Sequence, residues 1–174
     1  MAGSKDGAAR ALDAVSRIVR EARMEQDADG ARRAVARLTA ECMGYRAAAL
    51  GIIDSDGLLK FTVFGEAPNC QEARACREAP TRAPDGSWIS APLAGIGRFI
   101  GTLIGYGHGT GTFDAEDLRI HARLCDSVAV ILEAQMARAN LVETMDRDAV
   151  TGLYNRKHLV KRIHEEISRA ERYG

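Results

Sequence analysis

The chain has 174 residues, enough for one domain with a hydrophobic core, or for one domain and a fragment of a second. Lys plus Arg and Asp plus Glu number 24 each, so no net charge draws the chain toward nucleic acid or an acidic surface. The longest strongly apolar run, residues 47–53, is far too short to span a membrane, and no signal-peptide core opens the chain. We therefore expect a cytoplasmic protein with no membrane segment and no nucleic-acid partner.

Two helices are predicted before Gly44. Residues 1–7 are small and polar and are expected to be disordered. Residues 8–24 place apolar side chains on one helical face, among them Leu12 and Ile18. Asp29 can cap a second helix, which Gly44 ends.

Four strands and a long helix follow. Residues 46–53 and 58–64 flank a strong turn signal and predict a β-hairpin, and residues 87–94 and 99–106 predict two further strands. A helix is predicted over residues 114–145, capped by Asp114. This order predicts an α+β fold, an antiparallel sheet with helices packed mainly on one face and a long C-terminal signalling helix.

The long helix carries two offset apolar stripes, which predict two packing partners: its own domain and a second copy of the chain. His121 and Cys125 lie on the stripe with heptad-like spacing. We expect the part of this stripe in the dimer stalk to comprise Val128, Leu132, Gln135, Ala139 and Val142. The alternative is one amphipathic helix packed on a single core.

A ligand pocket is predicted between the helix-free face of the sheet and the long connection, residues 65–86. That connection holds three of the four prolines and little apolar periodicity, and inserts of this size are often functional. A gap between the sheet and such a segment would form a pocket. The candidate pocket residues are Phe64, Cys70, Cys76 and Trp88.

The four cysteines show neither a CxxC pair nor zinc-ligand spacing, so no metal site is predicted. Cys42 and Cys125 are expected to be small core residues, and His121 a core or interface residue. Cys70 and Cys76 lie near arginines, which lower a thiol pKa, so a redox couple there is an alternative. The seven glycines between Gly95 and Gly111 lack the order of a phosphate loop and are expected to serve turns.

The layout from Leu12 to Glu133 resembles a GAF domain, the small-molecule sensor module. The likeness is carried by three segments in order, residues 90–93 (Ser-Ala-Pro-Leu), 99–105 (Phe-Ile-Gly-Thr-Leu-Ile-Gly) and 113–118 (Phe-Asp-Ala-Glu-Asp-Leu). The resemblance implies a sensor domain over residues 8–133, followed by a signalling helix or coiled-coil linker over residues 134–147. It does not indicate which ligand would bind.

Residues 148–156, Asp-Ala-Val-Thr-Gly-Leu-Tyr-Asn-Arg, resemble the opening of a GGDEF domain, the diguanylate cyclase domain, with Val150 where the family has leucine. The residues that match this joint motif are Asp148, Thr151, Gly152, Leu153, Asn155 and Arg156. The resemblance implies that residues 148–174 begin a truncated catalytic domain. The family's Gly-Gly-Asp/Glu-Glu-Phe signature is absent, so no catalytic residue is expected in this fragment. GTP and magnesium are expected only for the missing domain.

Together the resemblances imply the sensory and dimerisation region of a bacterial-type diguanylate cyclase. A bound small molecule would shift a homodimeric stalk between two packings, and a GGDEF domain would make cyclic di-GMP from GTP. Three alternatives remain: a ligand-free dimerisation module, a cysteine-based redox sensor similar to methionine-sulfoxide reductases of the GAF type, and a receptor whose cyclase-like domain is inactive.

Overall fold

A computed structural model describes residues 3–25, 27–54, 56–67 and 77–145, together with residues 151, 153–155, 159, 160, 162, 163, 166, 167 and 170. The chain forms two units, Met1–Gln135 and Met136–Gly174. The first unit contains the sheet, two helices and most of a third. The third helix, α3 (Ala115–Met145), is continuous across the boundary between the units.

Five antiparallel strands form the sheet in the order β2-β1-β5-β4-β3. The strands are β1 (Ala47–Ile53), β2 (Leu59–Gly65), β3 (Thr81–Arg82), β4 (Trp88–Gly95) and β5 (Arg98–Tyr106). Four of them match the predicted strands closely. The fifth, β3, lies within the predicted connection and pairs with β4 through Ser90 and Ile89.

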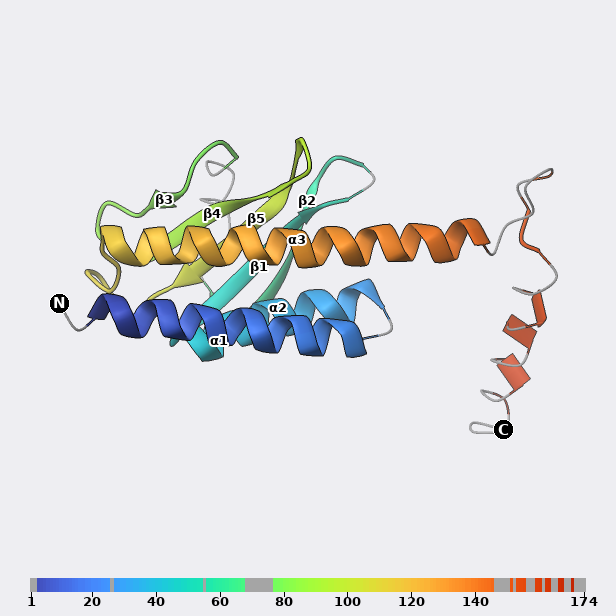
Figure 1. Ribbon diagram of the computed structural model, residues 1–174, viewed down its shortest axis with the longest axis horizontal. Helices are drawn as coiled ribbons and strands as arrows, with labels where there is room; N and C mark the ends of the chain where they lie inside the picture. The colour runs from blue at the N-terminus through green and yellow to red at the C-terminus, as the bar shows by residue number, and fades with distance from the viewer. Residues whose placement is uncertain are drawn as a thin grey trace. The chain divides into compact units, whose positions relative to one another are not determined.

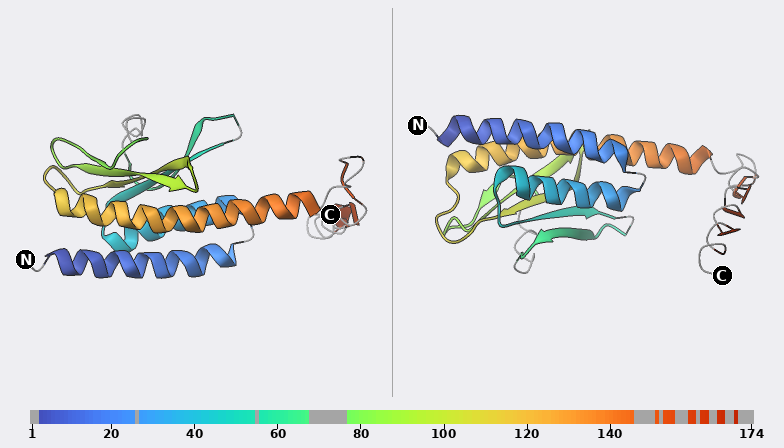
Figure 2. Two further views of the ribbon diagram at one scale, coloured as in Figure 1. Left: turned by 45° about the horizontal axis from the view of Figure 1, so that its top comes forward. Right: turned by 90° about the horizontal axis from the view of Figure 1, so that it is seen from below.

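The helices lie on one face of the sheet, as predicted (Figures 1 and 2). They are α1 (Gly3–Met24), α2 (Ala28–Met43) and α3. The core between helices and sheet is aliphatic: Leu38 of α2, Leu50 of β1 and Leu103 of β5 are fully buried. Removing these side chains from water is the main contribution to the stability of the domain.

The helix ends differ from the prediction in two places. Residues 3–7 are helical, because α1 begins at Gly3, so the predicted disorder of residues 1–7 is wrong for these five residues. The N-cap of α2 is Asp27, whose carboxylate accepts from the Gly30 amide, and not Asp29. Gly44 ends α2 with φ of 71°, as predicted, in a conformation that favours glycine.

The cap of α3 is confirmed. The Asp114 carboxylate accepts from the amides of Glu116 at 2.7 Å and Asp117 at 2.9 Å. Hydrogen bonds from these amides, that of Asp117 first, lower the pKa of Asp114. The cap therefore remains charged at neutral pH and suits the positive end of the helix dipole.

From Ile120 to Leu132 both apolar stripes of α3 are buried or half-buried within its own domain, which corrects the prediction that one of them faces a second copy. Val128 is fully buried and Leu132 is 4% exposed, both in the same core as Ile120 and Leu124 of the other stripe. The physical reason is that α3 has the sheet on one side and α1 on another, so two stripes are covered by one chain (Figure 2). Gln135, also placed in the stalk, donates to the Ala22 carbonyl of α1 at 2.9 Å.

The hydroxyl of Thr39 on α2 is buried and has no hydrogen-bond partner among the residues that the structure describes. We expect Thr39→Val to raise the free energy of unfolding by about 1 kcal/mol, because a desolvated hydroxyl is replaced by a methyl group of similar shape. Urea denaturation measures the change. The matched control is Thr102→Val, where the hydroxyl is hydrogen-bonded and the same substitution should destabilise the domain. A loss of stability at both positions would contradict the prediction.

Candidate functional site

The candidate ligand site is the sheet face opposite the helices, which we call the distal face. Its apolar cluster is built from β1 and β5, where Ala47 pairs with Tyr106 and Ala49 with Ile104. Side chains alternate along a strand, so the neighbours Ala48 and Leu50 point to the helices instead. The two sides of the sheet thus form two separate apolar clusters.

Aromatic rings border this cluster. Trp88 of β4 pairs with Tyr106 and is half-buried, so its indole packs against the cluster while keeping an open side. Phe61 of β2 lies opposite Gly51, and an added Cβ at Gly51 would come within 2.6 Å of its ring. Glycine at position 51 therefore lets the Phe61 ring lie across the sheet.

The distal face contains two buried hydroxyl groups that are hydrogen-bonded to each other. Ser90 and Thr102 are fully buried, with their oxygens 2.9 Å apart, and Thr102 donates to the Ala91 carbonyl at 3.2 Å. Ser90 therefore donates to Thr102 and keeps lone pairs that can accept a further hydrogen bond. These hydroxyls were missed in the sequence, although Ser90 lies two residues from Trp88 and therefore on the same face.

The structure separates Phe64 from Trp88, which corrects their assignment to one pocket. Phe64 pairs with Ala48, on the helix side, whereas Trp88 pairs with Tyr106 on the distal face. Phe64 instead lines a separate cleft of about 380 Å³ between α2 and β2, together with Arg33. The other two predicted pocket residues, Cys70 and Cys76, lie outside the described residues.

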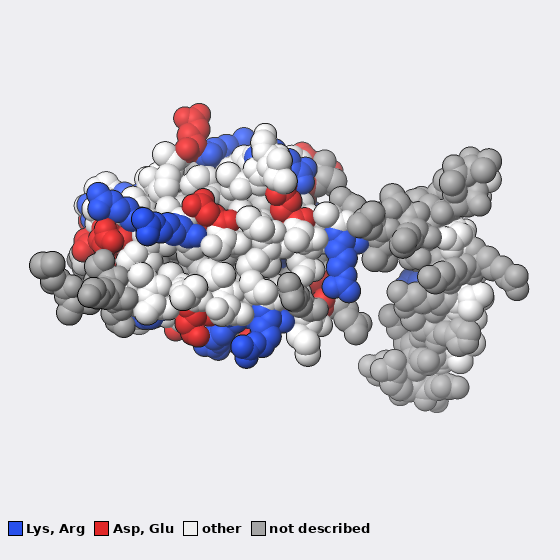
Figure 3. Space-filling view, in the orientation of Figure 1, with Lys and Arg blue, Asp and Glu red and all other residues white. Residues whose placement is uncertain are grey.

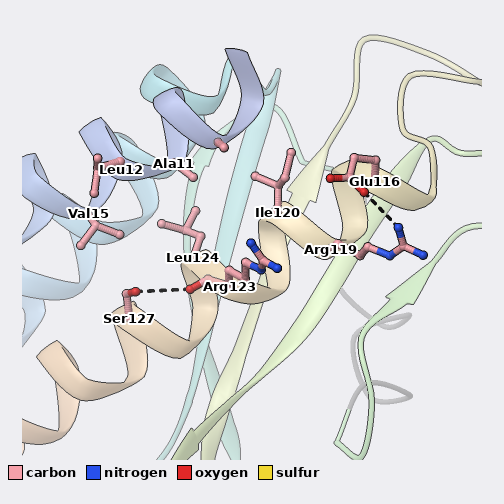
Figure 4. A pocket seen from close by; sticks show the side chains of 10 residues that line it. Ala11, Leu12, Val15, Glu116, Arg119, Ile120, Arg123, Leu124 and Ser127 are labelled. Carbon is pink, nitrogen blue, oxygen red and sulfur yellow. Dashed lines mark hydrogen bonds and ion pairs between the residues drawn. The ribbon is translucent and has the colours of Figure 1, made fainter. Parts of the chain in front are cut away.

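A second cavity, of about 490 Å³, is a groove between α1 and α3 (Figure 4). Its apolar lining consists of Ala8, Ala11, Leu12, Val15, Ile120 and Leu124. Glu116 and Arg119 form an ion pair of 3.1 Å at one end, and the Ser127 hydroxyl donates to the Arg123 carbonyl. Leu12, predicted on the buried face of the first helix, is 69% exposed.

A buried polar contact joins α3 to the sheet. His121 is fully buried, with Nε2 3.0 Å from the Leu103 carbonyl oxygen and Nδ1 3.3 Å from the Tyr45 hydroxyl. The carbonyl can only accept, so Nε2 carries the proton and Nδ1 accepts from Tyr45. Burial lowers the pKa of His121 to about 4, despite the opposing hydrogen bond to Leu103. His121 was predicted to be a core or interface residue, and the structure shows that it is a core residue.

The two described cysteines are unsuited to thiol chemistry. Cys125 is fully buried, as predicted, and burial raises its thiol pKa. Cys42 is half-buried and accepts from Arg17 at 3.2 Å, yet desolvation again raises its pKa. A high pKa keeps both as thiols, which are poor nucleophiles. No group of His, Cys, Asp and Glu side chains within the described ranges could hold a metal ion.

Only part of the predicted joint motif falls on described residues. Thr151 Oγ1 accepts from the Leu153 amide at 3.4 Å, and the Asn155 carbonyl accepts from the Leu159 amide at 3.2 Å. Asp148, Gly152 and Arg156 lie outside the described residues, as do the side chains of Ala139 and Val142. None of the helices in the described part of the chain has the length and apolar content that a membrane span needs.

Solved structures share this fold at low sequence identity. The GAF domain of an Acinetobacter phosphoenolpyruvate-protein phosphotransferase is 15% identical with a TM-score of 0.55, and the match covers 75% of this chain and 97% of that one. Free methionine-R-sulfoxide reductase from Neisseria meningitidis, solved with its substrate, is 20% identical with a TM-score of 0.58, covering 76% and 94%. The second GAF domain of DevS from Mycobacterium smegmatis is 22% identical with a TM-score of 0.55, covering 66% and 99%.

No protein-family model matches the sequence, and no curated protein matches it. The likeness to solved structures therefore concerns the fold. The chain has a GAF-like fold, an antiparallel five-stranded sheet with helices on one face and a long final helix.

Proposed function

We propose that this chain is the sensory and dimerisation region of a diguanylate cyclase. A small molecule bound at the distal face would shift the dimer between two packings, and α3 would carry this change to a GGDEF domain that makes cyclic di-GMP from GTP. The observation that carries the proposal is the continuity of α3, which is part of the core behind the sheet and runs on into the second unit. A rigid helix can transmit a change of packing over such a length.

The chemistry of the distal face favours a small ligand with a flat apolar part. Trp88 and Phe61 are half-buried and offer aromatic surface, while Tyr106 and the Ser90 hydroxyl are buried in the same face. A few polar groups on an apolar surface are typical of small-molecule sites.

The dimer interface that we propose is the face formed by α1 and α3, in place of the buried stripe of Val128 and Leu132. This face contains the groove of Figure 4, with Leu12 on its rim, and it extends along α3 to Val130, which is 68% exposed. Uncharged side chains cover most of the middle of this face in Figure 3. A second copy would bury these exposed apolar side chains.

The cyclase output is supported by the sequence of the joint motif and by the second unit. Described residues between 159 and 170 have helical backbone, and Leu159, Ile163 and Ile167 are each about half exposed. In the proposal these side chains pack against the remainder of a catalytic domain. A longer form of the chain that includes a full GGDEF domain should convert GTP to cyclic di-GMP.

Native mass spectrometry of the protein purified from its expression host tests the proposal. We expect a dimer that carries a small extra mass, which is lost under denaturing conditions. Trp88 is the only tryptophan, so the released compound, added back to the stripped protein, should change its fluorescence. A monomer would contradict the proposed dimer. An extra mass that leaves Trp88 fluorescence unchanged would contradict the distal face as the site.

The redox alternative rests on Cys70 and Cys76, because the described cysteines have raised thiol pKa values. Alkylation of the native protein separates the two functions. In the sensor proposal, modification of these loop cysteines leaves dimerisation unchanged. Two results together would favour the redox sensor. Alkylation would abolish dimerisation, and in a separate sample oxidation would also abolish it until a thiol reductant restored the dimer.

A further inference from the structure

The turn between β4 and β5 is held by a side chain from α3. This turn, residues 95–97, extends into solvent, and Ile96 at its tip is 91% exposed. Its amide donates to Glu133, with the nitrogen 3.1 Å from each carboxylate oxygen. A hydrogen bond to a charged acceptor is stronger than one between neutral groups.

Gly95 fits the turn to this carboxylate. A Cβ added at Gly95 would lie 2.6 Å from Glu133 Oε1, a distance that real side chains do not adopt. The carboxylate, which is the end of a flexible side chain, would have to move to make room for a side chain at position 95.

The contact lies where α3 reaches the end of the first unit. Glu133 precedes by two residues Gln135, which ends that unit and donates to the Ala22 carbonyl of α1 at 2.9 Å. The same two strands carry Trp88 and Tyr106 on the distal face. A movement of β4 and β5 therefore reaches α3 through Glu133, while Gln135 ties the helix to α1.

We propose that Glu133 is a positioning residue that couples the β4–β5 turn to α3, and so links the distal face to the helix that continues into the second unit. This inference rests on the proposed sensor function, since it names the route by which the sheet and α3 communicate. The coupling through Glu133 can be tested without a ligand. The coupling can therefore fail while ligand binding is confirmed, and ligand binding can fail while the coupling is confirmed.

The test is amide exchange in the full chain, followed by NMR, in Glu133→Ala, Glu133→Gln and Gly95→Ala. In Glu133→Ala we expect the Ile96 amide to exchange at least about tenfold faster, and amides of residues 136–145 about threefold faster. Alanine favours helix more than glutamate does, so faster exchange in α3 cannot come from helix propensity. Glu133→Gln keeps one acceptor oxygen and should restore part of the protection at both places.

Gly95→Ala acts on the same contact from the other side. It should reproduce the faster exchange of residues 136–145, and its effect should fall below about twofold when Glu133→Ala is already present, because the added methyl group then meets no carboxylate. The control is Asp126→Ala, an exposed acidic residue of α3 that should leave both regions unchanged. The proposal is overturned if the turn loosens while residues 136–145 keep their exchange rates, or if the two substitutions act additively.

Discussion

Lowering the pH from 7 to 4 is expected to remove about 3 kcal/mol from the free energy of unfolding through His121 alone. Its pKa is about 4 in the folded domain, against an ordinary value of 6.5, because burial disfavours the imidazolium. Between these two values the unfolded chain binds more protons than the folded one. The contribution of His121 to the free energy of unfolding is therefore fully present above about pH 6.5. It falls as the pH drops and is lost near pH 4.

Urea denaturation between pH 4 and 7.5 measures this dependence. His121→Gln should flatten the curve over that window, because glutamine does not titrate, and its amide can still donate to the Leu103 carbonyl. The substitution also leaves the Tyr45 hydroxyl without its acceptor, so the variant should be less stable at pH 7. His108→Gln, at an exposed position, is the control for the substitution itself. Equal slopes in wild type and His121→Gln would contradict the prediction.

The second large effect is expected at Val128, which is fully buried, in contrast to Val130 two positions along the same helix, which is 68% exposed. Val128→Asp should destabilise the domain by about 3–5 kcal/mol, because it buries a charge with no partner. Val130→Asp should change the free energy of unfolding of the dissociated monomer by less than about 0.5 kcal/mol. Equilibrium urea denaturation of the two variants gives the comparison.

The same pair tests the proposed dimer interface. Val130→Asp places a charge on the face formed by α1 and α3, so its dimer should dissociate at a concentration at least about tenfold higher than that of the wild type. Analytical ultracentrifugation measures this directly. Ala134→Ser is a mild control at an exposed position of α3. If Val128→Asp were a folded monomer of unchanged stability, the predicted dimer stalk through Val128 would be favoured again. If the Val130→Asp dimer were unaffected, the α1–α3 face would be ruled out.

These outcomes would also bear on how a signal leaves the domain. If the dimer forms on the exposed side of α1 and α3, the buried side of α3 is free to respond to the sheet. His121 and Glu133 then attach the helix to β5 and to the β4–β5 turn. A change at the distal face would reach both contacts through the same strands.

The sequence by itself determined the order and type of the elements. Residue composition, alternation and turn signals located β1, β2, β4 and β5, and local capping chemistry located the start of α3 at Asp114, because these signals lie within a few neighbouring residues. The short β3 escaped detection, since a two-residue strand carries no period. The end of α2 at Gly44 and the turn at residues 54–57 were also predicted from neighbouring residues alone.

Only the tertiary structure decided which faces are covered. The spacing of Val128 and Leu132 is the same for a dimer seam as for a helix held between a sheet and another helix, so the pattern could not separate the two. The faces of Phe64 and Trp88 depend on the register that joins β2, β1, β5 and β4, which is set by contacts distant in sequence. Glu133 gave no signal at all, because its partner is a backbone amide 37 residues away. Local periodicity determines what a segment can form, and long-range packing decides what it touches.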